Sequence, residues 1–113
     1  MVTVTLSGTS KEDAAGVLGV LRTAFPTDGP DPVTHEQPGD RPAVWTADIE
    51  PTRERARTEP ATLASQVTAT VQGGYVAVDQ VIEALSAAFD VQEQGTASGD
   101  QEKEVDLRLR TKA

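Results

Sequence analysis

His35 is the one histidine of the chain, and its side chain is the one best suited to acid–base chemistry near neutral pH. It lies in the segment PVTHEQPG, directly before Glu36. A general base at this position would need an orienting carboxylate and a nearby hydroxyl group. Because few histidines are catalytic, we predict that His35 lies on an exposed loop or an edge strand, and we keep it as a loop candidate for function.

The chain offers few other groups for catalysis. It has no cysteine and one histidine among 113 residues, which excludes disulfides, thiolate nucleophiles and any site that needs two imidazoles. The acidic residues do not follow the spacing of an EF-hand. Gly73-Gly74 lacks the further glycines and the lysine of a phosphate-binding loop, so we predict a tight turn with positive φ there. We therefore predict no cofactor and no metal site.

Basic residues gather at two places in an otherwise acidic chain, which carries 18 acidic residues, 10 basic residues and a net charge of −8. One group lies within 53–57. The other consists of Arg108, Arg110 and Lys112, on alternate residues and hence on one face of a strand. Such a row could contact a phosphate or an acidic partner. Its ordinary explanation is pairing with carboxylates across neighbouring strands, namely those of Asp48, Glu104 and Asp106.

The first half of the chain predicts a strand followed by a helix. Residues Val2–Ser7 alternate apolar and polar side chains, which is typical of a half-buried strand. Gly8 ends the strand, and Thr9 with Glu12 forms a capping box for a helix. Apolar side chains then recur at spacings of three and four residues until Pro26 ends the helix.

The second half repeats this pattern. Residues 67–73 resemble 2–8, and a second helical stripe follows. Its residues Val81, Ile82, Leu85, Ala88 and Phe89 have the spacing of Val17, Leu18, Leu21, Ala24 and Phe25. Two matches in the same order predict an internal duplication of a β-α unit.

Each unit also ends in an alternating strand, at 44–50 and at 104–110. Shorter candidate strands precede them at 33–37 and 91–94, so each repeat would end in a hairpin. All seven prolines lie between positions 26 and 60. We predict one domain over 1–113, made of a repeat at 1–50, a connector at 51–62 with a helical turn near 53–57, and a repeat at 63–113.

This order of elements predicts an α+β fold of the ferredoxin-like type, β-α-β-β-α-β, with one antiparallel sheet and both helices on one face. The other face of the sheet would be polar. We take it as a candidate binding surface, with the site residues Thr3, Thr70, Asp106, Arg108 and Arg110.

We predict a small cytoplasmic, non-catalytic binding or protein-interaction module, either an accessory subunit or a homodimer. The alternative is a small cofactor-independent enzyme or ligand binder with a pocket between helices and sheet. We expect no nucleic-acid partner, because the chain is acidic and the strands lack aromatic residues for stacking. We expect no membrane partner, because no apolar run approaches the ~20 residues of a membrane span.

Overall fold

The computed structural model of the protein describes residues 1–25, 44–51 and 56–112. These residues form two helices and five strands, which agrees with the predicted α+β class. The elements are β1 (Val2–Ser7), α1 (Lys11–Ala24), β2 (Val44–Ile49), β3 (Val67–Gly74), α2 (Tyr75–Ala88), β4 (Phe89–Ser98) and β5 (Glu102–Thr111). The candidate strand at 33–37 and most of the predicted turn at 53–57 lie outside the described residues.

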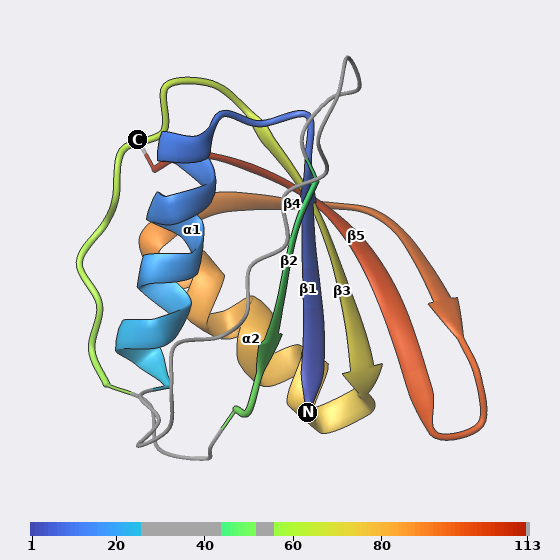
Figure 1. Ribbon diagram of the computed structural model, residues 1–113. Coiled ribbons are helices and arrows are strands. Elements are labelled where there is room, and N and C mark those ends of the chain that lie inside the picture. Colours follow the sequence, from blue (N-terminus) through green and yellow to red (C-terminus); the bar gives the residue numbers. More distant parts are fainter. Residues whose placement is uncertain (26–43, 52–55, 113) are drawn as a thin grey trace.

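The five strands form one sheet in the order β2-β1-β3-β5-β4, with every neighbouring pair antiparallel (Figure 1). Both helices lie on one side of the sheet and contact each other. The predicted ferredoxin-like order is wrong. In the second half, β3 and β4 are parallel with β5 between them, whereas β1 and β2 in the first half are direct antiparallel neighbours. The 19 residues between α1 and β2 are long enough to return the chain to the opposite end of the sheet, so β2 need not run parallel to β1.

The hydrogen-bond registers on the two sides of the sheet centre correspond to each other. Thr5 of β1 lies opposite Thr70 of β3 at this centre. On one side β1 pairs with β2, and on the other side β3 pairs with β5. The buried pairs are Val2–Ile49, Val4–Ala47 and Leu6–Trp45 on the first side, and Val67–Leu109, Ala69–Leu107 and Val71–Val105 on the second. Residues that are equivalent in the two sequence halves therefore have equivalent partners.

The predicted core faces are confirmed. Alternate residues of β1, β2, β3 and β5 are buried together with the apolar stripes of α1 and α2 in one cluster. Both helices end in the same way, because the N–H of Phe25 donates to Leu21 O and the N–H of Phe89 donates to Leu85 O. Both phenylalanine side chains are buried beneath these helix ends.

Two local predictions need correction. The N-cap of α1 is Ser10 and not Thr9, since the Ser10 hydroxyl accepts a hydrogen bond from the N–H of Asp13 at 3.2 Å. Gly73 and Gly74 form no turn with positive φ; the one glycine with such a backbone among the described residues is Gly8, at 64°. Gly73 belongs to β3, where a Cβ would lie 2.8 Å from the carbonyl oxygen of Met1. The absence of a side chain there allows close approach of the chain's first residues.

Residues 56–66, which precede β3 and are called the connector from here on, are fixed by hydrogen bonds to both helices and to β5. At α2, the N–H of Ala61 donates to the carbonyl oxygen of Ala88 at 3.3 Å. Asp13 of α1 is buried, and its carboxylate accepts the N–H groups of Ala64 at 2.9 Å and Ser65 at 3.1 Å. The Thr111 hydroxyl exchanges hydrogen bonds with the N–H and carbonyl of Leu63. In Figure 1 this connector runs along the side of α1 that faces away from the sheet.

No helix among the described residues is long and apolar enough to cross a membrane.

Candidate functional site

The side of the sheet opposite the two helices is here called the open face. Strand alternation creates it, because every second residue of β1, β3 and β5 is buried against the helices and the residues between them point the other way. Neither described helix packs on it. Its members on β1, β2, β3 and β5 are Thr3, Thr5, Ser7, Val44, Thr46, Asp48, Thr68, Thr70, Gln72, Gly74, Glu102, Glu104, Asp106, Arg108 and Arg110.

These side chains form rows that run across the strands, and the rows differ in charge. The acidic row consists of Asp48, Thr3, Gln72 and Glu104. The central row consists of Thr46, Thr5, Thr70 and Asp106. The basic row consists of Val44, Ser7, Thr68, Arg108 and Gln92. Arg110 lies beyond it, opposite the exposed Asp90 of β4. Successive rows are two residues apart, or about 6.6 Å, so the open face changes from acidic to basic along the strand direction.

Two hydrogen bonds join neighbouring strands, each within one of these rows. The Thr3 hydroxyl donates to the Asp48 carboxylate at 2.9 Å, and the Thr70 hydroxyl donates to the Asp106 carboxylate at 2.9 Å. Each threonine lies directly opposite its aspartate in the register. All five predicted site residues of the sheet therefore share one face, although Thr3 lies two strands away from β5.

The arginines of the open face do not pair as predicted. Arg108 lies opposite Thr68 on one side and Gln92 on the other, so neither neighbour is a carboxylate. Arg110 lies opposite Asp90, yet within the described ranges neither arginine forms an ion pair of 4.0 Å or less. Glu104 likewise has no ion-pair partner among the residues described. Among the described residues, the open face thus carries two arginines without an ion-pair partner at one end and a glutamate without one at the other.

The other predicted candidates contribute less. His35, Arg53 and Arg55 lie outside the described residues. Arg57 is exposed and lines a shallow groove of about 480 Å³ between α1 and the connector, where Gly16 and Gly19 form part of the floor.

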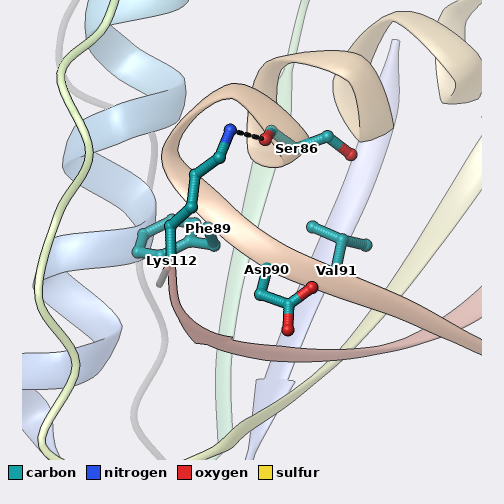
Figure 2. A pocket seen from close by; sticks show the side chains of 5 residues that line it. All are labelled: Ser86, Phe89, Asp90, Val91 and Lys112. Carbon is teal, nitrogen blue, oxygen red and sulfur yellow. Dashed lines mark hydrogen bonds between the residues drawn. The ribbon is translucent and has the colours of Figure 1, made fainter.

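A second depression, of about 420 Å³, lies where α2 ends and β4 begins (Figure 2). Its lining residues are Ser86, Phe89, Asp90, Val91 and Lys112. The ammonium group of Lys112 donates to the carbonyl oxygen of Ser86 at 3.1 Å, and so points to the end of the helix. This arrangement caps the last turn of α2, as cations near a helix C-terminus commonly do.

Two polar groups were missed at the sequence level. Asp13 is buried and holds the connector, but an aspartate in the first turn of a helix is ordinary and gives no signal of a tertiary role. Trp45 is buried, and its indole N–H has no hydrogen-bond partner among the described residues. Within the same residues, no three His, Asp or Glu side chains gather as metal ligands.

The chain matches no protein-family model, no curated protein and no solved structure.

Proposed function

We propose that this protein is a non-catalytic interaction module that binds a protein partner through the open face of its sheet. The observation that carries the proposal is the separation of charge on this face. Within the described part of the chain, Arg108 and Arg110 have no ion-pair partner at one end and Glu104 has none at the other, on a floor of small hydroxyl side chains. A partner with the opposite arrangement would satisfy both ends at once.

The chemistry of the open face favours a protein partner over other ligands. A nucleic acid would need clustered cations or stacked aromatic side chains, whereas the chain has a net charge of −8 and the open face has no aromatic residue. A small ligand would need a concave site. A location in the cytoplasm belongs to this proposal, since a chain without cysteine does not depend on an oxidising compartment.

An enzyme with a pocket between helices and sheet is less well supported. The side chains that meet in this layer are fully buried, including Leu21, Leu85 and Phe89. The two depressions at the α1 groove and the end of α2 lie outside the layer. Binding at the surface is therefore the better supported of the two functions.

The size of the open face suggests that binding is reversible. Five strands spaced by about 4.8 Å and about 20 Å long present a flat area of roughly 480 Å². A stable interface of standard size buries about 800 Å² on each partner. We expect a transient complex whose affinity falls as salt screens its charges.

Site-specific photo-cross-linking in cells tests the proposal. A photoreactive amino acid replaces Thr68, which is exposed in the basic row on β3, the middle strand of the sheet. Ala15, which is exposed on α1, serves as the reference position. We expect protein cross-links from position 68. They should disappear in a variant with Arg108→Glu and Arg110→Glu, here called the acidic variant, because its charge no longer matches the partner.

A matched control separates the open face from a general effect of charge. Lys11→Glu with Arg57→Glu changes the net charge by the same amount, but both side chains are exposed on the helix side of the molecule. The control should keep the cross-links from position 68. Cross-links that arise only from position 15, or that survive in the acidic variant, would show that the open face is not the binding surface.

We also infer that the two halves of the chain arose by duplication. The equivalent buried partners on both sides of the Thr5–Thr70 centre support this inference. So do the equal lengths of α1 and α2, which have 14 residues each.

A further inference from the structure

The open face of β5 begins with Glu102, opposite Gly74 at the end of β3, and then carries an ordered series of four charges. Glu104, Asp106, Arg108 and Arg110 occupy alternate positions, and the residues between them are buried in the core. The series reads acid, acid, base, base along the strand. Within the described residues, none of the four takes part in an ion pair, and only Asp106 has a side-chain hydrogen bond, from Thr70.

This series is complementary to itself when it is reversed. If one copy of β5 is laid antiparallel over another with Leu107 at the centre, position 104 faces position 110 and position 106 faces position 108. Every carboxylate then faces a guanidinium group. Because the pattern is symmetric, both copies use the same residues in the same way, as an isologous two-fold contact requires.

We propose that the partner of the open face is a second copy of this chain, bound face to face about a two-fold axis. The axis lies between the two sheets, perpendicular to the strands and level with Leu107. This inference rests on the function proposed above. In the dimer, Glu104 meets Arg110 of the partner subunit and Asp106 meets Arg108 of the partner subunit. The symmetry repeats both contacts, which gives four ion pairs along about 20 Å of strand.

The neighbours of β5 leave room for these long side chains. On one side β3 presents Thr68 and Thr70, and on the other side β4 presents Gly95 opposite Asp106 and Ala97 opposite Glu104. Two packed sheets are separated by about 10 Å. The larger Gln72, Gln92 and Asp90 flank Glu104, Arg108 and Arg110 in the same way. Glutamate and arginine side chains are long enough to extend beyond them and span this distance from both sheets.

The charges also decide the direction of the two copies. A two-fold axis parallel to the strands would set acids against acids and arginines against arginines, which is strongly unfavourable. Pairing through the outer edge of β4 is disfavoured as well. The register of β4 shifts between Glu93 and Gly95, and a bulge with an exposed charge blocks regular addition of a further strand.

Three charge variants test the proposal by sedimentation equilibrium. The protein concentration runs from about 1 µM to about 1 mM, which covers the dissociation constants expected for an interface below the standard size. The first is the acidic variant. The basic variant has Glu104→Arg and Asp106→Arg. The swapped variant carries all four changes. It keeps the net charge of the original chain, and its composition differs only in one glutamate in place of one aspartate.

The original chain and the swapped variant should both dimerise, because each keeps every acid opposite a base. The acidic and the basic variants should each dimerise at least about tenfold more weakly, and an equimolar mixture of the two should form a heterodimer. Their net charges are −8 − 4 = −12 and −8 + 4 = −4, so general attraction between oppositely charged proteins cannot explain that heterodimer. Added salt should weaken each of these dimers.

Circular dichroism and thermal unfolding of each variant show whether it is folded, and only folded variants are compared. An original chain that stays monomeric throughout would overturn the self-association. So would a swapped variant that stays monomeric while the original chain dimerises, since another surface would then be in use. If the chain is monomeric but position 68 still cross-links a different protein in a charge-dependent way, the proposed function stands and only the second copy is refuted. If both measurements are negative, both proposals fail.

Discussion

Asp13 fixes the connector to the first helix, and its replacement gives a sharp test of the fold. Its side chain is 4% exposed, and its two carboxylate oxygens accept the N–H groups of Ala64 at 2.9 Å and Ser65 at 3.1 Å. These contacts join positions that are 51 and 52 residues apart. We expect Asp13→Ala to lower the free energy of unfolding more than a change at any exposed acid of the same helix.

The magnitude follows from the two hydrogen bonds. A hydrogen bond to a charged acceptor contributes about 1.5 to 3 kcal/mol. Ala64 and Ser65 are exposed, so water replaces part of what is lost, and we expect a total loss of about 2 to 4 kcal/mol. Asp13→Asn keeps one acceptor oxygen but turns an amide NH₂ toward the second N–H, so about 1 to 2 kcal/mol should be lost.

Urea denaturation measures both changes, with Glu12→Ala as the matched control. Glu12 lies in the same first turn but is exposed, so its removal costs only the interaction with the helix dipole, about 0.3 to 1 kcal/mol. Hydrogen exchange should also become faster at the amides of Ala64 and Ser65. An Asp13→Ala variant that loses no more stability than Glu12→Ala would refute the anchoring role.

Two further predictions concern packing. Truncation of either Phe25 or Phe89 to Ala should cost about 3 to 5 kcal/mol, because both rings are buried beneath helix ends; denaturant midpoints that do not change would show that these rings are not core residues. Gly73→Ala should cost about 1 to 3 kcal/mol, because the new Cβ would lie 2.8 Å from the carbonyl oxygen of Met1. Gly74→Ala is its control, since a Cβ there meets no atom within 4 Å, and equal melting temperatures of these two variants would contradict the close approach at Gly73.

Local features of the fold could be predicted from the sequence, because periodicity is a local property. The buried residues Trp45, Ala47 and Ile49 of β2 follow from strict alternation, and the stripes of α1 and α2 follow from spacings of three and four. The order of the strands could not be predicted in this way. The order depends on which strands pair with each other. β5 lies beside β3, and β2 pairs antiparallel with β1; both pairings join residues far apart in the sequence.

The extent of β4 shows where pattern recognition stops. The sequence predicts a strand only at 91–94, whereas β4 covers Phe89–Ser98. Apart from Phe89 and Val91, the residues of β4 are exposed. They therefore lack the alternation of apolar and polar residues by which a half-buried strand is predicted. Its hydrogen bonds to β5 hold it in place, and these leave no signature in the pattern of hydrophobic residues.

The candidate site was predictable in part. Alternation alone places Asp106, Arg108 and Arg110 on one face, as the structure has them. The partners of these charges were not predictable, because they depend on register. Arg108 could have met a carboxylate on a neighbouring strand, yet the register brings Thr68 and Gln92 beside it.

The core of the protein determines which charges the open face presents. Val105, Leu107 and Leu109 are buried against the helices, and the charged residues of β5 lie between them. A slip of β5 by one residue would expose these three side chains and bury the charges, so the hydrophobic pattern fixes the register. The acid-to-base order along the open face is therefore as firmly held as the core itself, while the charged positions can be exchanged without a change in core packing. For this reason the swapped variant can separate the polarity of the face from the stability of the fold.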